Sequence, residues 1–172
     1  MDSTITTSQT IGPFPHEAWR WGVDATSTLV SNAPVITISG ILRDGDGNPI
    51  NDGWIEVWLP EAVAAESTQA IPGFRRIPSN DQGGFRIEVS LPTPAVSGKP
   101  VLFATIFARG LVKHQFTAVF LEDDSGIAQS DILNQVPANR RDTLIARKLS
   151  DTEYQWDIWM QTNKETVFFD YM

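Results

Sequence analysis

Short stretches in which apolar and polar residues alternate are the dominant pattern of the chain, and they are typical of strands with one buried face. Glycine, proline and asparagine turns separate them. Strands are predicted over residues 35–42, 54–59, 74–77, 85–91, 101–110, 114–120, 154–160 and 166–170. Roughly seven to nine short strands with little helix favour an all-β fold, an antiparallel β-sandwich in a single domain.

The most apolar of these segments is residues 101–110, in which every residue up to Ala108 is apolar or β-prone. Such a run predicts a strand buried on both faces in the middle of a sheet. Arg109 follows at its end. Because an unpaired buried guanidinium is costly, Arg109 must reach water or meet an anion. Spacing alone favours an ion pair with a local carboxylate at the rim.

Other segments carry weaker signals. Residues 1–34 have no sustained period, and we predict a long N-terminal arm, which serves a partner or a pocket, ahead of a sandwich domain over residues 35–172. Residues 44–49 (DGDGNP) predict a tight turn rather than a calcium loop, since the later ligands of an EF-hand are missing. Residues 61–72 fit a helical turn or a loop, and residues 139–148 fit a helix start or an extended arm into a strand.

The amino-acid composition argues against several classes of function. The net charge is −8 with no basic block, which argues against nucleic acid or an anionic membrane as partner. There are no cysteines, and neither a long apolar span nor a signal peptide is present, so we expect a cytoplasmic protein. Six tryptophans and nine phenylalanines serve either an aromatic core or an interface with a partner.

Candidate chemistry from residue types is sparse. The two histidines lack a G-x-S-x-G serine to activate, which argues against a hydrolase. His16 and His114 with Tyr154 and Tyr171 are ligand types that suit ferric iron, but their spacing argues against a shared site. His114 is therefore expected to be an edge or packed histidine.

Six ordered motifs nevertheless resemble one family. They are TSQTIGPF at 7–14, ISGILRDGDGNP at 38–49, WIEVW at 54–58, FARG at 107–110, RRDTLIA at 140–146 and ETVFFD at 165–170. Together they resemble the intradiol ring-cleavage dioxygenases, and within them the α chains of the two-chain protocatechuate 3,4-dioxygenases. The resemblance spans nearly the whole chain and implies a β-sandwich.

In that family a homologous β chain holds a non-haem Fe(III) through two tyrosines and two histidines. Aligning on FARG places Val101 and Phe103 where the β chain has its His-x-His pair, and residues 85–96 contain no tyrosine. The resemblance therefore implies an iron-free subunit, with no metal in this chain, that pairs with a β chain in αβ units and a higher oligomer.

The resemblance also implies that the α chain lines the substrate pocket of its partner. The contributing positions here are Thr10, Gly12, Pro13, Phe14 and Arg109. Gly12 and Pro13 suit close backbone approach to a ligand, and an arginine suits the carboxylate of protocatechuate. Family members often have tyrosine where Phe14 stands, and the chain is shorter than usual between residues 15 and 35.

The implied reaction is O2-dependent opening of the protocatechuate ring to 3-carboxy-cis,cis-muconate by the assembled pair. This chain alone is expected to be inactive. Two alternatives stay open. One is a homomeric catechol-type dioxygenase, which the missing ligands disfavour, and the other is a transthyretin-like binding module without an enzyme partner.

Overall fold

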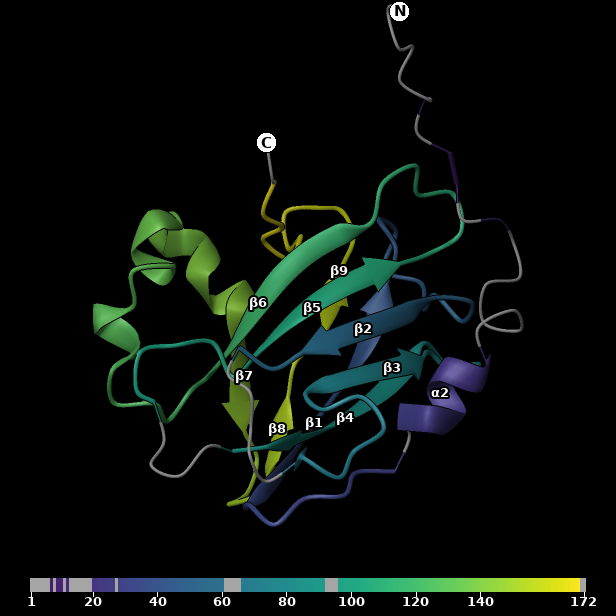
Figure 1. Cartoon of the computed structure of the whole chain (residues 1–172). Coiled ribbons are helices and arrows are strands. Elements are labelled where there is room, and N and C mark those ends of the chain that lie inside the picture. The colour runs from purple at the N-terminus through teal and green to yellow at the C-terminus, as the bar shows by residue number, and fades with distance from the viewer. Residues whose placement is uncertain are drawn as a thin grey trace, which may run out of the picture.

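In the computed structural model, the described residues are 7, 9, 10, 12, 20–26, 28–60, 66–91 and 96–170. They form one short α-helix, nine strands and three 3₁₀ turns (Figure 1). In chain order these are α2 (Arg20–Thr26), β1 (Val35–Arg43), β2 (Trp54–Trp58), β3 (Phe74–Pro78), β4 (Gly84–Ser90), β5 (Leu102–Phe107), β6 (Gln115–Leu121), η2 (Ile127–Gln129), η3 (Leu133–Gln135), η4 (Ala138–Leu144), β7 (Ile145–Lys148), β8 (Glu153–Gln155) and β9 (Ile158–Trp159).

The strands follow one another in the order β3-β2-β5-β6-β7-β8-β1-β4, with β9 also paired to β1. β3, β2, β5 and β6 lie in front of the other strands in Figure 1. The front and rear strands meet where β6 pairs with β7 over two residues, Phe120↔Ile145 and Leu121↔Ala146. The all-β prediction is confirmed. Most pairs are antiparallel as predicted, but β1·β8, β1·β9 and β6·β7 are parallel.

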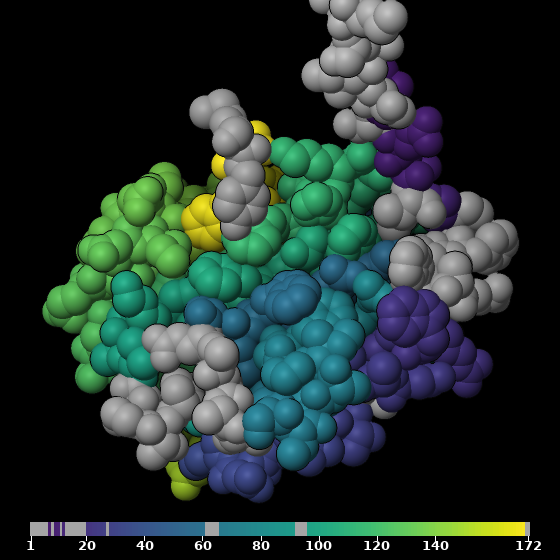
Figure 2. All heavy atoms as spheres, viewed as in Figure 1, coloured from purple at the N-terminus to yellow at the C-terminus, as the bar shows by residue number. Residues whose placement is uncertain are grey.

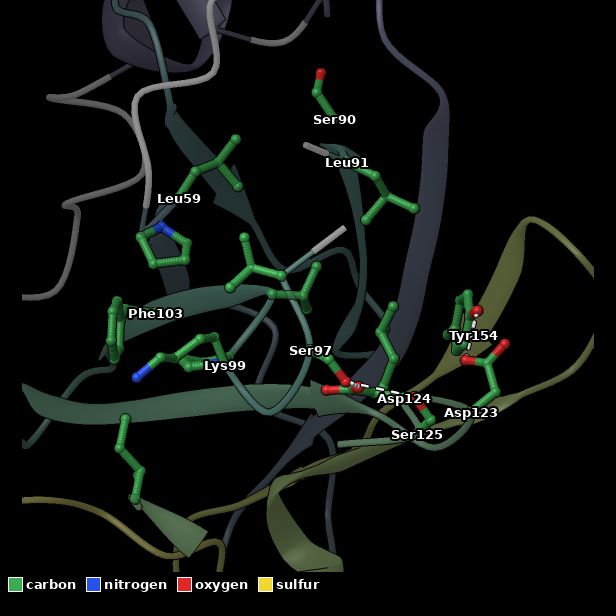
Figure 3. Close-up of a pocket in the computed structure, with 16 residues that line it drawn as sticks. Leu59, Ser90, Leu91, Ser97, Lys99, Phe103, Asp123, Asp124, Ser125 and Tyr154 are labelled. Atoms are coloured by element: carbon green, nitrogen blue, oxygen red, sulfur yellow. Dashed lines mark hydrogen bonds between the residues drawn. The ribbon is translucent and has the colours of Figure 1, made fainter. Parts of the chain in front are cut away.

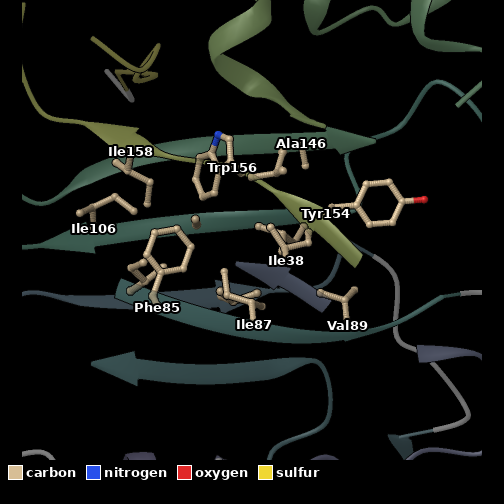
Figure 4. Close-up of a cluster of buried hydrophobic side chains, with 14 of the residues drawn as sticks. Ile38, Phe85, Ile87, Val89, Ile106, Ala146, Tyr154, Trp156 and Ile158 are labelled. Carbon is tan, nitrogen blue, oxygen red and sulfur yellow. The ribbon is translucent and has the colours of Figure 1, made fainter. Parts of the chain in front are cut away.

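The main core lies between these two sets of strands, where alternate residues point inward. On β4 the buried residues are Phe85, Ile87 and Val89, as the alternation predicts. Ile38 of β1 and Ile106 of β5 belong to the same buried cluster (Figure 4). The core thus draws on strands that are far apart in sequence.

The prediction of a strand in residues 101–110 is confirmed, and β5 lies between β2 and β6 as a central strand. The prediction that both its faces are buried is wrong. Leu102, Ala104 and Ile106 are buried, whereas the alternate residues, Phe103 to Phe107, are only half-buried. Among the described residues, Phe103 on this outer face stacks on Phe116 and packs against a second cluster, and Phe107 packs on Trp54.

The doubly buried strand is instead β6. Val119 faces the main core, while Ala118 and Phe120 face a second cluster with Leu133, Val136 and Leu144. The 3₁₀ segments after β6 supply this second cluster, which is why four successive residues of β6, 117–120, are buried. Phe116 of the same strand is only half-buried.

The structure also tests the predictions made for the segments with weaker sequence signals. Residues 138–144 form η4 and lead directly into β7, so the segment combines both predicted alternatives. The strand predicted at 166–170 is reduced to a single bridge between Phe116 and Phe169. The predicted turn at 44–49 forms, with Asp44 accepting hydrogen bonds from the backbone of Asp46 and Asn48. Residues 61–65 of the predicted turn or loop lie outside the described residues.

The helix α2 is an element that the sequence pattern did not predict. Figure 2 shows it, in purple, seated against the surface over β3. Thr26, which is 2% exposed, donates to Gly22 O at 2.8 Å and accepts from the backbone N–H of Arg76 at 3.0 Å. Part of the predicted arm is therefore fastened to the sheet by a buried hydroxyl.

Two close-packed features stabilise the strands around this core. A Cβ on Gly40 of β1 would lie 1.8 Å from the carbonyl oxygen of Trp156, so only glycine fits there. Glu66 and Arg75 form a buried ion pair, 0% and 4% exposed, with Arg75 donating to Oε1 at 2.6 Å and to Oε2 at 3.0 Å. Burial acts to raise the pKa of Glu66, but the hydrogen bonds from Arg75 and the backbone of Gly73 outweigh it and lower the pKa.

No helix in the described part of the chain has both the length and the apolar character needed to cross a membrane.

Candidate functional site

The register of β2 against β5 sets the geometry around Arg109. Trp54 lies opposite Phe107 in this antiparallel pair. Asp52 lies two residues before Trp54 and Arg109 two residues after Phe107, so the antiparallel register brings them opposite each other. Arg109 Nε lies 3.0 Å from Asp52 Oδ2. The rim ion pair that the spacing favoured is present.

The ion pair is asymmetric in burial. The side chain of Arg109 is 66% exposed and that of Asp52 only 16%. The closest contact uses Nε, and neither terminal guanidinium nitrogen donates a hydrogen bond to a described residue. An exposed pair of this kind adds little stability, about 0–1 kcal/mol. Its structural effect is to orient a guanidinium whose outer edge faces solvent.

Aromatic side chains flank this ion pair on the same sheet face. The Trp54 and Phe107 rings are 5.1 Å apart, and Phe107 contacts His114 at 5.6 Å between centroids. Trp54 is 4% exposed, and its indole N–H has no hydrogen-bond partner among the described residues. His114 is exposed and packs on Phe107, in agreement with an edge histidine.

This arrangement is suited to binding rather than to chemistry. A guanidinium with free terminal nitrogens can hold a carboxylate through two parallel hydrogen bonds. We name the set Asp52, Trp54, Phe107, Arg109 and His114 the Arg109 rim. Its geometry suits an aromatic acid, and it includes no nucleophile paired with a base.

The other predicted pocket residues lie on the N-terminal arm. Thr10 is exposed, and Gly12 has a φ of 85°, a conformation that glycine adopts without strain. A Cβ on Gly12 would meet no described residue within 4 Å. Pro13 and Phe14 lie outside the described residues. No hydrogen bond or ion pair among described residues joins Thr10 or Gly12 to Arg109, so their shared pocket stays a prediction.

Sequence reasoning singled out Arg109 but missed Asp52 and Trp54. Both precede or begin a predicted strand, and nothing in their local pattern marks them. Only the pairing register between β2 and β5 brings Asp52 opposite Arg109.

A cleft of about 710 Å³ opens at the other end of β5 (Figure 3). Val101 and Phe103, the positions that the resemblance aligns with the His-x-His pair of the family's β chains, both line it. Figure 3 shows Ser97, Asp124 and Ser125 together on one side, with Leu59 and Phe103 on the other.

The acidic side of the cleft is held by internal hydrogen bonds. Asp123 accepts from Tyr154 Oη and from Lys148 Nζ, each at 2.9 Å. Asp124 accepts from the hydroxyl of Ser97 and from the backbone N–H groups of Gly98 and Gly126. Desolvation acts to raise the pKa of each carboxyl, but these donors outweigh it and both pKa values are lowered.

The cleft does not suit an iron ion. Valine and phenylalanine at 101 and 103 offer no donor atom, and the Tyr154 hydroxyl already donates to Asp123 at 2.9 Å. Among the described residues no group of three or more His, Asp or Glu side chains could hold a metal. His16 and Tyr171 lie outside them.

Sequence comparison extends these observations. The chain is 29% identical to the protocatechuate 3,4-dioxygenase alpha chain of Burkholderia cepacia over 193 residues, covering 96% of each chain. The alpha chain from Pseudomonas putida matches with the same identity and coverage. No family model matches the chain. The resemblance to protocatechuate 3,4-dioxygenase alpha chains is thus confirmed over almost its full length.

Solved structures support the fold. The dioxygenase domain of a dioxygenase–carbohydrate-binding fusion from Streptomyces sp. SirexAA-E matches with a TM-score of 0.57 and 13% identity, covering 81% of this chain and 85% of that one. The 3-chlorocatechol 1,2-dioxygenase of Rhodococcus opacus 1CP matches with a TM-score of 0.55 and 17% identity, covering 75% of this chain and 60% of that one. At these identities the likeness concerns the fold alone.

Proposed function

We propose that this chain is the iron-free α subunit of a protocatechuate 3,4-dioxygenase and that it acts only when assembled with a homologous β chain. The observation that carries the proposal is the similarity to two curated alpha chains over 96% of the sequence. The Arg109 rim supports it, because an exposed guanidinium beside aromatic rings suits an aromatic acid.

The proposed reaction is intradiol cleavage of protocatechuate, in which both atoms of O2 enter the product 3-carboxy-cis,cis-muconate. The Fe(III) that this chemistry needs is assigned to the β chain. In this chain the aligned positions are Val101 and Phe103, which have no ligand atoms. The part of this chain is therefore to complete the substrate pocket of the β chain and to bind the substrate there.

Arg109 has the central part in this proposal. Its terminal nitrogens are available for the substrate carboxylate, while its Nε is engaged by Asp52. Asp52 thereby acts as a positioning residue, since it limits the orientations of the guanidinium before substrate arrives. This charge would favour protocatechuate over catechol, which lacks the carboxylate.

Thr10, Gly12, Pro13 and Phe14 are proposed to add the second wall of the same pocket. Gly12 has the positive φ that lets backbone approach a ligand or the partner chain closely. Phe14 contributes a ring face without the hydroxyl that family members often place there.

The decisive experiment is co-expression with the β chain, followed by kinetics on protocatechuate and catechol. For Arg109→Ala, kcat/KM on protocatechuate should fall about 10- to 100-fold, the value of a hydrogen-bonded charge, with little change on catechol. Arg86→Ala is the matched control, because Arg86 is also exposed, at 58%, and lies on β4.

The outcomes separate the alternatives. Unchanged kcat/KM in Arg109→Ala would refute the carboxylate contact but leave the subunit assignment standing. A purified chain that binds iron and turns over catechol alone would establish a homomeric dioxygenase. A chain that neither assembles with the β chain nor binds iron would support a binding module.

A further inference from the structure

The cleft at the start of β5 is a second site, separate from the Arg109 rim. The six residues of β5 separate the two by about 20 Å, at about 3.3 Å per residue. The volume of about 710 Å³ falls within the range typical of small-molecule pockets. The proposed function gives this cleft no role.

Its walls are largely apolar and come from distant parts of the chain. The apolar side chains that line it include Leu59, Leu91, Val96, Phe103, Leu121 and Ile132. Phe103 is held in place by stacking on Phe116, with ring centroids 5.5 Å apart. An apolar or aromatic ligand body would therefore bury surface against a preformed wall.

The two carboxylates at the rim are not free to bind a cation. Asp124 already accepts three hydrogen bonds, from Ser97, Gly98 and Gly126. Asp123 is neutralised by Lys148 and also accepts from Tyr154. Asp124 thus ties the loop at 97–98 to the turn after β6, whereas Asp123 ties that turn to β7 and β8.

Lys99 is different from the other charged residues of the cleft. Its ammonium forms no ion pair or hydrogen bond with any residue in the described ranges, and its side chain is exposed at the mouth. Figure 3 shows it extending toward the side of the cleft where Phe103 lies. An apolar wall and one uncommitted ammonium thus stand together.

We propose that this cleft binds a small amphipathic monoanion, with an aromatic or aliphatic body against Phe103 and a carboxylate at Lys99. The chemistry of the lining selects this class: the apolar walls require an apolar body, and the only charge without a partner among the described lining residues is positive. The site is a binding site without catalysis. It depends on neither the β chain nor iron.

The test is calorimetric titration of the full chain with 1-naphthoate and with the neutral 1-naphthalenemethanol. Wild type should bind one naphthoate per chain saturably. Lys99→Gln should weaken naphthoate binding about 2- to 5-fold, as expected for an exposed charge pair, and leave binding of the alcohol unchanged. Val96→Trp, at a side chain that is 40% exposed, should fill the cleft without disturbing the core and should weaken both ligands.

Lys113→Gln is the matched lysine control, because Lys113 pairs with Asp170 away from the cleft. Absence of saturable binding would overturn the proposal, and so would equal naphthoate affinity in wild type and Lys99→Gln. Binding that is lost in Arg109→Ala but kept in Val96→Trp would assign the anion to the Arg109 rim and also overturn it. Because no partner chain is needed, failure here leaves the proposed subunit role intact.

Discussion

The buried ion pair between Glu66 and Arg75 allows a quantitative test of the packing of this domain. Glu66→Gln keeps the shape of the side chain but removes its charge, leaving the guanidinium of Arg75, 4% exposed, without a counter-ion. Breaking such a pair costs about 3–5 kcal/mol. Arg75 keeps its hydrogen bonds to the carbonyl oxygens of Phe74 and Glu88, so we expect the lower value, about 3 kcal/mol.

Urea unfolding followed by tryptophan fluorescence measures this loss. With an m-value of about 2 kcal/mol/M, a loss of about 3 kcal/mol lowers the midpoint by about 1.5 M. Lys113→Gln breaks an exposed pair with Asp170 and should change stability by less than about 0.5 kcal/mol. If Glu66→Gln costs no more than this control, the pair is not desolvated and the reasoning fails.

Two further measurements sharpen the interpretation. Replacing both partners, as Glu66→Leu with Arg75→Met, should cost less than Glu66→Gln because no charge is left buried alone. The folded state lowers the pKa of Glu66, so its contribution is fully present above the unfolded pKa and is lost as pH falls through the folded value. The difference in stability between wild type and Glu66→Gln should be constant from pH 8 to about 5 and should shrink progressively as the pH falls below about 4.

Three other substitutions test separate contacts in the same assay. Gly40→Ala should prevent β1 from pairing normally, since its Cβ would overlap the carbonyl of Trp156, and we expect a loss of more than about 3 kcal/mol or no folded protein. Thr26→Val should cost about 1–3 kcal/mol by removing the buried hydroxyl that accepts from the backbone N–H of Arg76, with Thr26→Ser restoring most of the loss. Asp124→Asn should destabilise at pH 7, and this loss should shrink as the pH falls below about 4, because the lowered pKa makes the carboxylate's contribution fully present above the unfolded value and lost as the folded state is protonated; a loss that does not change with pH would contradict this.

Much of the fold could be predicted because alternation is a local signal. β4 shows it plainly, with Phe85, Ile87 and Val89 buried in turn. Burial of a second face could not be predicted in the same way. Nothing in the residues of β5 indicates that its outer face is only half-buried, or that the 3₁₀ segments bury the second face of β6 instead.

The helix α2 was missed for a related reason. Its sequence, RWGVDAT, combines a glycine with β-branched residues and has no helical period. Its place is set by tertiary contacts, namely the Thr26 hydrogen bonds and the Arg76 guanidinium 5.9 Å from the centre of the Trp21 ring. Helix propensity depends on neighbouring residues in the sequence and therefore cannot predict such tertiary contacts.

Of the residues in the candidate site, one could be identified from local sequence and another could not. Arg109 stood out because a charge at the end of an apolar run requires a partner. Asp52 could not be identified, since it becomes relevant only through the register of β2 on β5. The cleft beside Lys99 could not be predicted at all, because it is a space between loops that no periodicity describes.

The parallel pairing of β1 has a consequence for how the chain acquires its structure during synthesis. β1 begins at Val35, yet one of its edges is paired by β8 and β9, which end at Trp159. The N–H of Ile41 likewise depends on the carboxylate of Asp157, 116 residues later. Closing so large a loop is slow, and β1 cannot be completed until almost the whole chain has left the ribosome. Until then its open edge can pair with another nascent chain, so we expect truncation before residue 153 to yield aggregates rather than a smaller folded domain.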